Sequence, residues 1–302
     1  MTSQMINAAA AGAWELGDRT VNRIGFGAMR LPQTGEAFAA DAALRDRDQA
    51  ISVLRRAVEL GVNHIDTAAF YFSPLRSANE LINRALAPYL DDLVITTKVG
   101  PGRSPSGQWL PHATPEQLRG QVEENLRQLG RDHLDVVNLR IVGTDSIAER
   151  FGALAELREA GLIRHLGLSN VRPHHLAEAQ TIAPVVCVQN MYGIGASPEQ
   201  KEFLDLCGEQ HIAFVPFYSI AGTGRTAGAT TGDNDEMLAI ARAHGVSTAQ
   251  IRLAWTLHQG PHVLAIPGTG DPGHLAQNVA AGSLRLSEDE LTALNSLRHE
   301  TV

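Results

Sequence analysis

Short apolar segments recur along the whole chain and are separated by longer segments in which apolar residues follow helical spacing. Most of the short segments are continuously hydrophobic rather than alternating, which is typical of parallel strands covered on both faces. The predicted strands are Arg23–Gly27, Asn63–Asp66, Val94–Lys98, Leu134–Leu139, His165–Leu168, Val185–Gln189, Ala213–Phe217 and Val263–Ile266.

The intervening segments carry helix start and stop signals. Thr114, Pro115 and Gln117 supply an N-cap, a first-turn proline and the glutamine of a capping box. Gly130 and Gly245 follow helical patterns where a left-handed C-cap favours glycine. The predicted helices are Asp46–Leu60, Ser77–Tyr89, Thr114–Leu129, Ser146–Ala160, Pro173–Gln180, Ser197–Glu209, Asp235–His244, Ser247–Gln259, Pro272–Ala281 and Ser287–Leu297.

Repeated alternation of strand and helix predicts a (β/α)8 barrel, the TIM-barrel fold, as a single domain over residues 1–302. A doubly wound open sheet is the alternative, but Gly25–Arg30 lacks the third glycine of the G-x-G-x-x-G turn which that fold favours. Residues 1–15 are predicted to be an N-terminal tail. The Gly- and Thr-rich stretch Ile220–Asn234 is interpreted as a loop over the active site, although its composition equally fits a surface loop without a role.

Composition narrows the possible functions. The net charge is −8 and the 25 Lys and Arg residues are scattered, which argues against a nucleic-acid partner. The sequence has no run of 18 apolar residues, so no membrane span is expected. Two cysteines, Cys187 and Cys207, suit the reducing cytoplasm as buried thiols. The twelve histidines show no zinc-binding spacing, so no metal site is predicted.

Three ionisable residues follow the second and third predicted strands. Asp66 and Tyr71 come at and after the end of one strand, and Lys98 closes the next. A phenol with a pKa of roughly 10 exchanges protons poorly near neutral pH, and an adjacent ammonium group lowers that pKa. A carboxylate can hold the ammonium in place and keep it charged. The three residues therefore predict an acid/base site, provided that the two strands are neighbours.

Other groups gather at the carboxyl ends of later strands, where barrel enzymes bind their ligands. Amides and hydroxyls can bind a carboxamide, an aromatic ring can stack on a flat ring, and the N-terminus of a helix can bind phosphate. These features suit a nucleotide cofactor. The groups are Ser169-Asn170, Gln189-Asn190, Phe217-Tyr218 and Pro267–Gly270.

The chain resembles an aldo-keto reductase along nearly its whole length. The matching stretches are Ile24–Met29 (IGFGAM), His64–Tyr71 (HIDTAAFY), Thr97-Lys98, Gly167–Asn170 (GLSN), Val188-Gln189 and Ile266-Pro267-Gly268 with Asn278. The resemblance implies a nicotinamide cofactor and a small carbonyl substrate. It makes Tyr71 the proton donor, Lys98 the group that lowers its pKa, and Asp66 the anchor of Lys98. The implied cofactor-binding residues are Gly27, Ala28, Met29, Asp66, Ser169, Asn170, Gln189, Phe217, Tyr218, Gly268, Thr269, His274 and Asn278.

Two departures from the family pattern stand out. Arg140 occupies the place of the family's usual catalytic histidine, and it can donate hydrogen bonds but no proton. We expect Arg140 to orient an anionic group of the substrate; the alternative is a surface ion pair. The segment Gly268–His274 carries no Lys or Arg, and Asp271 would repel a phosphate that it faced. NADPH is expected from the family's habit, with NADH as the rival.

The resemblance implies that the protein reduces an aldehyde or a ketone to the alcohol. The stretches Val137–Arg140, Cys187–Asn190 and Val215–Phe217 resemble the bacterial pyridoxal reductase branch of the family, which makes pyridoxal a candidate substrate. A non-catalytic subunit that binds the cofactor and senses redox state is the alternative function. The sequence does not indicate an oligomeric state.

Overall fold

A sheet of seven parallel strands forms the centre of the molecule. The computed structural model describes residues 6–35, 38, 42–220 and 234–297. Along the sheet the strands follow the order β11-β10-β9-β8-β7-β4-β3, so the strands of this sheet lie side by side in the order in which they occur in the chain. Their bounds are β3 Phe26–Gly27, β4 His64–Asp66, β7 Val94–Val99, β8 Leu134–Arg140, β9 Ile163–Ser169, β10 Val185–Gln189 and β11 Ala213–Phe214.

The predicted eighth strand closes the sheet through isolated bridges instead of a continuous ladder. Val263 pairs with Phe214 at one edge, and Ala265 pairs with Ile24 at the other, both in parallel. The Ala265 N–H donates to Arg23 O at 2.9 Å, and the Gly25 N–H donates to Ala265 O at 2.8 Å. These bonds join the first and last strands, and the (β/α)8 barrel is confirmed.

Glycine at the first strand permits this close contact. A Cβ at Gly25 would lie 2.7 Å from His64 O, and a Cβ at Gly27 would lie 2.6 Å from Ile266 O. Real Cβ atoms do not approach backbone oxygens so closely, so a side chain at either position would push its neighbouring strand away. The glycines of the sequence IGFGAM thus serve the closure of the barrel.

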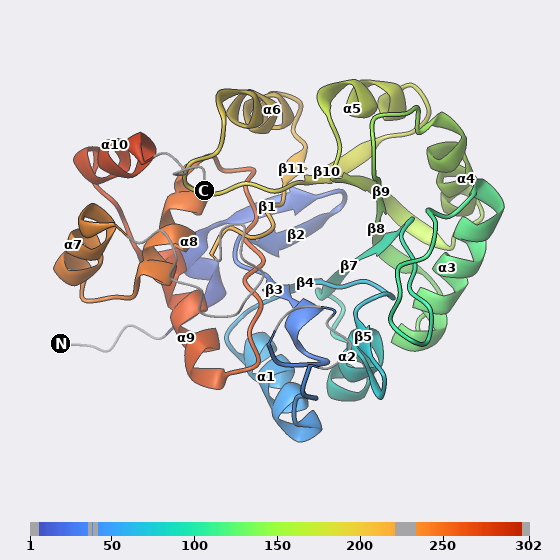
Figure 1. The fold of residues 1–302 in the computed structure, drawn as a ribbon, viewed down its shortest axis with the longest axis horizontal. Helices are drawn as coiled ribbons and strands as arrows, with labels where there is room; N and C mark the ends of the chain where they lie inside the picture. The colour runs from blue at the N-terminus through green and yellow to red at the C-terminus, as the bar shows by residue number, and fades with distance from the viewer. Residues whose placement is uncertain (1–5, 36–37, 39–41, 221–233, 298–302) are drawn as a thin grey trace.

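Helices surround the sheet, and the predicted ones are all present with boundaries within a few residues (Figure 1). Several predicted first residues, such as Asp46 and Ser197, are N-caps whose side chains accept a backbone N–H of the first turn. Gly130 and Gly245 adopt φ 64°, as left-handed C-caps. The bounds are α1 Arg47–Glu59, α2 Ala78–Leu86, α3 Pro115–Leu129, α4 Ala148–Glu159, α5 Pro173–Gln180, α6 Pro198–Glu209, α7 Asp235–His244, α8 Thr248–His258, α9 Pro272–Ala280 and α10 Glu288–Ser296.

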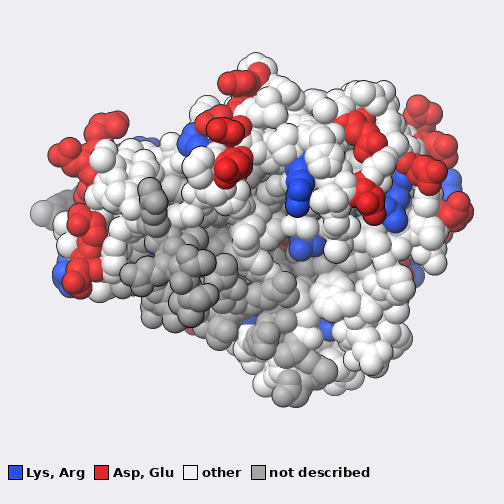
Figure 2. Space-filling view, turned by 45° about the horizontal axis from the view of Figure 1, so that its top comes forward, with Lys and Arg blue, Asp and Glu red and all other residues white. Residues whose placement is uncertain are grey.

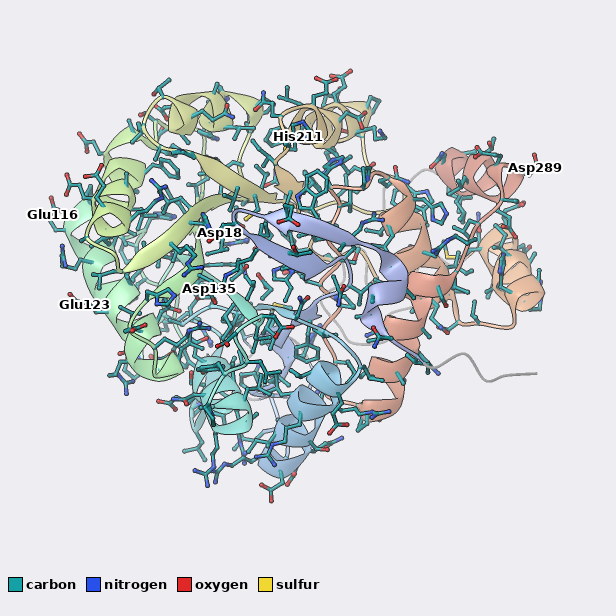
Figure 3. All side chains as sticks on the ribbon, turned by 180° about the vertical axis from the view of Figure 1, so that it is seen from behind. Asp18, Glu116, Glu123, Asp135, His211 and Asp289 are labelled. Carbon is teal, nitrogen blue, oxygen red and sulfur yellow. The ribbon has the colours of Figure 1, made fainter. Side chains whose placement is uncertain are left out.

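The prediction that residues 1–15 form a tail is wrong for the described part of that segment. Ala8–Ala11 forms a 3-10 helix (η1), and Ala13–Leu16 (β1) pairs antiparallel with Arg19–Asn22 (β2). This hairpin lies across the amino-terminal side of the barrel, with Asp18 at its turn (Figure 3). Residues 1–5 lie outside the described residues.

The hairpin belongs to the barrel's hydrophobic interior. Leu16 and Val21 are fully buried and cluster with Val94, Val136 and Leu264 from the barrel strands. At the turn, Asp18 Oδ1 lies 2.6 Å from His165 Nε2 of β9. This role could hardly be predicted, because a four-residue strand with one buried side chain carries almost no periodicity.

Three shorter features complete the carboxyl-terminal face of the barrel. Ala28–Arg30 forms a 3-10 helix (η2), directly after β3. Phe72–Ser73 (β5) and Arg76–Ser77 (β6) form a small antiparallel pair that was not predicted.

Ile220–Asn234, interpreted above as a loop over the active site, lies almost entirely outside the described residues, so that interpretation stays a prediction.

Acidic side chains gather along the outer rim of the face shown in Figure 2, with a few basic side chains among them. This distribution agrees with the net charge of −8. None of the helices among the described residues is both long enough and apolar enough to cross a membrane. A cytoplasmic location stays a prediction.

Truncating Leu16 tests whether the hairpin stabilises the barrel. We expect Leu16→Ala to lower the free energy of unfolding by about 2–5 kcal/mol, because it leaves a cavity in a fully buried cluster. Urea denaturation followed by circular dichroism measures the change. Glu15→Ala is the control at an exposed neighbour and should stay within about 0.5 kcal/mol. Equal effects of the two variants would show that the hairpin is dispensable.

Candidate active site

A buried ion pair lies at the carboxyl ends of β4 and β7. Lys98 Nζ lies 2.7 Å from both Asp66 Oδ1 and Asp66 Oδ2, and it donates a third hydrogen bond to Thr67 O at 3.0 Å. The side chains of both residues are almost inaccessible to solvent, at 3% for Lys98 and 4% for Asp66. Nζ therefore contacts three oxygen atoms, and its position is closely defined.

The two strands bring these residues together because they are neighbours in parallel register. Asp66 pairs with Thr96, and Lys98 follows two positions later on the same face of β7. Burial by itself would lower the pKa of Lys98, but the Asp66 carboxylate beside it raises the pKa above its ordinary value. Lys98 therefore carries its charge throughout the physiological pH range.

Tyr71 lies over this pair. Its N–H donates to Ala68 O at 3.0 Å in a turn that follows β4, and the turn directs the phenol back over the strand end. Lys98 Nζ is 4.9 Å from the centre of the Tyr71 ring. The structure therefore brings together Asp66, Tyr71 and Lys98, the three residues predicted to form an acid/base site.

The expectation that the phenol is more acidic than an ordinary tyrosine is wrong for its net pKa. Burial raises the pKa of Tyr71, and this effect exceeds the lowering by the Lys98 ammonium and the Arg140 guanidinium. Lys98 lowers the pKa of Tyr71 as predicted, but the depth at which the ring is buried has no signature in the sequence. The consequence is a phenol that keeps its proton at neutral pH.

Gln189 at the end of β10 extends this network across the barrel. Its Nε2 donates to Asp66 Oδ1 at 2.7 Å. Its Oε1 is buried and has no hydrogen-bond partner among the described residues. A buried acceptor without a partner is costly in free energy, and it is a natural binding point for an N–H group.

Ser169 ends β9, beside Gln189 in the sheet, and Asn170 follows it. Ser169 Oγ accepts a hydrogen bond from Arg140 Nη1 at 3.3 Å. Asn170 adopts φ 60°, and its Nδ2 donates to Ile141 O at 2.9 Å. The three predicted polar residues of β9 and β10 thus lie at one edge of the barrel mouth.

Arg140 ends β8 and turns toward the site. Its guanidinium carbon lies 5.3 Å from the centre of the Phe217 ring, and its Nη1 reaches Ser169. Arg140 therefore contacts Phe217 and Ser169 at the site, in contrast to the alternative of a surface ion pair. Phe217 in turn packs edge-to-face against Tyr218, with ring centres 5.1 Å apart. Arg140, Phe217 and Tyr218 therefore form one side of the mouth.

Gly268, Thr269, His274 and Asn278, which the family resemblance assigns to cofactor binding, lie after the last strand and on α9. Gly268 follows the last strand and packs against Gly27. Asp271 caps α9, because its Oδ1 accepts the His274 N–H at 2.8 Å. His274 is mostly exposed, whereas Asn278 on the same helix is buried. The segment that includes Gly27, Ala28 and Met29 borders this region through η2.

An aromatic wall, which we define as Phe38, Phe70 and Trp109, was missed by the sequence analysis. Phe70 and Phe38 contact the Tyr71 ring at centre distances of 5.1 and 5.9 Å. Trp109 packs edge-on against both phenylalanines and is 51% exposed. The adjacent aromatics Phe70, Tyr71 and Phe72 were a signal for part of it, but nothing in the sequence connected Phe38 and Trp109 to them.

Arg103 contacts both the segment that carries Tyr71 and Trp109 of the aromatic wall. Its Nη1 donates to Phe72 O at 2.6 Å and to Phe70 O at 3.3 Å, and its guanidinium lies 5.8 Å from the centre of the Trp109 ring. One arginine therefore fixes the segment that carries Tyr71 relative to the loop after β7.

Within the described ranges, no three His, Cys, Asp or Glu side chains lie together in a way that could bind a metal ion. Both cysteines are buried, and burial raises the pKa of each thiol to about 12. The Cys187 thiol also donates to Asn138 Oδ1 at 3.1 Å, inside the barrel. Such thiols are unreactive toward oxidants and metals.

Comparisons with known proteins agree with the fold. The model of the Aldo/keto reductase family matches residues 23–299. The chain is therefore an oxidoreductase of the (β/α)8 barrel class, and it belongs to the aldo/keto reductase family.

Two relatives cover nearly the whole chain. Pyridoxine 4-dehydrogenase of Escherichia coli (strain K12) is 42% identical over 298 residues, covering 96% of this chain and 100% of the relative. An uncharacterized oxidoreductase, C215.11c, of Schizosaccharomyces pombe is 36% identical over 97% of this chain and 92% of its own length.

A solved structure of similar fold is an aldo-keto reductase from Klebsiella pneumoniae in complex with NADPH. It superposes with a TM-score of 0.76 at 27% identity, covering 92% of this chain and 91% of that chain. The thermostable aldo-keto reductase Tm1743, in complex with the inhibitor epalrestat, gives a TM-score of 0.77 at 28% identity, covering 94% and 99%.

His64, two residues before Asp66 on β4, should make the stability of the protein depend on pH. It is fully buried, with Nε2 3.1 Å from Thr96 Oγ1. Burial, with a smaller contribution from Lys98 and against the attraction of Asp66, lowers the pKa of His64 to about 4. In the unfolded chain the pKa is about 6.5, so between these values the unfolded state binds more protons than the folded state.

The free energy of unfolding should therefore decrease as the pH falls from about 6.5 toward 4. His64→Gln should make this part of the pH profile flatter, because glutamine keeps a polar group near Thr96 but does not titrate. Denaturant titrations at half-unit pH intervals measure the slope. His258→Gln, at an exposed position, is the control. A slope unchanged by His64→Gln would assign the pH dependence to other groups.

Proposed function

We propose that the protein reduces the carbonyl group of an aldehyde or a ketone to an alcohol, with NADPH as the reductant and Tyr71 as the proton donor. The observation that carries this proposal is the buried cluster of a charged lysine, its carboxylate partner and a protonated phenol at the carboxyl ends of β4 and β7. In a barrel enzyme this is the end at which reactions take place.

A reduced nicotinamide, when bound, would supply the hydride that the carbonyl carbon accepts. The Tyr71 hydroxyl donates its proton to the carbonyl oxygen as negative charge develops there. The Lys98 ammonium stabilises the resulting phenolate, and Asp66 keeps the ammonium charged and in position. A raised pKa suits this role, because the donor must hold its proton until the more basic alkoxide forms.

The residues at the mouth fit a nicotinamide cofactor. Gln189 Oε1, which is buried and has no partner in the described part of the chain, can accept an N–H of the carboxamide, and Ser169 and Asn170 lie at the adjoining strand end. Phe217 and Tyr218 would contact the flat ring, and Gly27, Ala28 and Met29 would line its other side. We assign the adenosine end to Gly268, Thr269, His274 and Asn278. The relative from Klebsiella pneumoniae, solved with NADPH, supports this choice of cofactor.

Pyridoxal is our candidate substrate. The relative named pyridoxine 4-dehydrogenase, 42% identical over nearly the full chain, supports it. The exposed face of Trp109 beside Tyr71 suits a flat aromatic ring. Pyridoxal carries an acidic ring hydroxyl beside its aldehyde, and the Arg140 guanidinium can donate hydrogen bonds to that anion.

Removing the phenolic hydroxyl tests the proposed proton donor. We expect the purified protein to oxidise NADPH in the presence of pyridoxal, which absorbance at 340 nm measures. Tyr71→Phe should lower kcat by roughly 10²–10⁴-fold, the range of general acid catalysis. Tyr89→Phe, remote from the site, should leave kcat unchanged. Cofactor binding without turnover of any aldehyde in a panel would instead favour the redox-sensing subunit.

The role of Arg140 is tested with two substrates that share one ring. Pyridine-4-carboxaldehyde lacks the ring hydroxyl of pyridoxal, so it offers Arg140 no anion. We expect Arg140→Gln to lower kcat/KM for pyridoxal by about 10–100-fold, in line with the roughly 1.5–3 kcal/mol of a hydrogen bond to a charged group. The value for pyridine-4-carboxaldehyde should change by no more than about twofold. Equal losses for both substrates would contradict this role and would indicate an effect of Arg140 through Ser169.

A further inference from the structure

Arg45 lies against the segment that follows the last strand, although the two are 225 positions apart in the chain. A methyl group added at Gly270 would overlap the Arg45 guanidinium, at its Cζ, Nη1 and Nε atoms. The segment Gly268–His274 has no Lys or Arg of its own. Tertiary structure therefore brings to this segment the cation that its sequence lacks.

The loop before α1 positions Arg45. Across this loop Gln33 and Leu44 form an antiparallel bridge, and the Thr34 N–H donates to Ala43 O at 2.8 Å. Arg45 Nε donates to Arg30 O at 3.0 Å, which directs the rest of the guanidinium toward Gly270. Its two Nη groups, which can bind phosphate oxygens in pairs, donate no hydrogen bond within the described ranges.

Glycine at position 270 leaves room for the Arg45 guanidinium; its backbone conformation does not require glycine. Its φ lies outside the left-handed region that favours glycine, so an alanine would fit the backbone. The absent side chain leaves room for the guanidinium at the entrance to α9. Any side chain at position 270 would displace the Arg45 guanidinium from its observed place.

The charges around Gly270 show what Arg45 changes. Asp271 caps α9 through the His274 N–H, and His274 Nδ1 lies 4.0 Å from Asp271 Oδ1. Without Arg45, the fixed charge at this helix entrance would be that of Asp271, which repels an anion. With Arg45 in place, its charge offsets that of Asp271, and the entrance also has a histidine and the N-terminal end of a helix.

We propose that Arg45 gives this protein its preference for NADPH over NADH, by binding the phosphate on the 2′-oxygen of the adenosine ribose, an inference that rests on the cofactor site proposed above. Arg45 replaces, from the loop before α1, a cation that the segment after the last strand does not supply. Asp271 makes the arginine necessary, because an unopposed carboxylate here would exclude the phosphate.

Two nucleotide fragments test this without nicotinamide, substrate or turnover. Adenosine 2′,5′-bisphosphate carries the 2′-phosphate, and adenosine 5′-monophosphate lacks it. By isothermal titration calorimetry, we expect the wild-type protein to bind the bisphosphate at least tenfold more tightly, a difference of about 1.4 kcal/mol. Arg45→Gln should reduce this ratio to less than about threefold, with the affinity for the monophosphate changed by no more than about twofold.

Gly270→Ala is a second, independent variant. Its added methyl group displaces the guanidinium while Arg45 itself remains, so it should reduce the same ratio. Arg47→Gln, two residues away and exposed at the start of α1, is the matched control and should keep the wild-type ratio. Thermal unfolding of each variant verifies that the fold is retained.

Each outcome has a definite meaning. A ratio unchanged in Arg45→Gln overturns the proposal, and so does a wild-type protein that binds both fragments equally, which would point to NADH. If neither fragment binds, the cofactor site itself is wrong and this inference fails with it. If the bisphosphate is preferred through Arg45 but no carbonyl compound is reduced, the proposed reaction fails and the role of Arg45 stands.

Discussion

The buried ion pair between Lys98 and Asp66 is the interaction on which the site depends. Burying either charge alone would cost several kcal/mol, and the pair is tolerable because Lys98 Nζ donates to both carboxylate oxygens and to Thr67 O. The geometry of the pair is set by two adjacent parallel strands. Any shift in their register would separate the charges, so the barrel and the site require each other.

The same burial determines how Tyr71 behaves. A phenol beside an ammonium group would be acidic in water, but this one is enclosed by Phe70, by Phe38 and by the barrel itself, and its pKa is raised. The cluster therefore holds a proton at rest and stabilises negative charge only when a strong base forms nearby. When the Tyr71 phenolate forms, the low dielectric of the buried site strengthens its attraction to the Lys98 ammonium.

Around this centre, the molecule uses single residues to join segments that are distant in sequence. Arg103 fixes the segment that carries Tyr71 relative to the loop with Trp109, and Gln189 reaches across the barrel to Asp66. Arg45 does the same at the far end of the mouth, against Gly270. A guanidinium or an amide offers several donors in a fixed plane, which lets one side chain connect several backbone or side-chain acceptors.

The sequence by itself determined the alternation of strands and helices, the caps of the helices, and the residues at the strand ends, because these depend on local periodicity and on short motifs. It therefore predicted the barrel and the set Asp66, Tyr71 and Lys98. Tertiary structure alone decided the closing hairpin, the net pKa of Tyr71 and the approach of Arg45 to Gly270. Burial and contacts between distant segments carry no local pattern, so they arise only when the whole chain has folded.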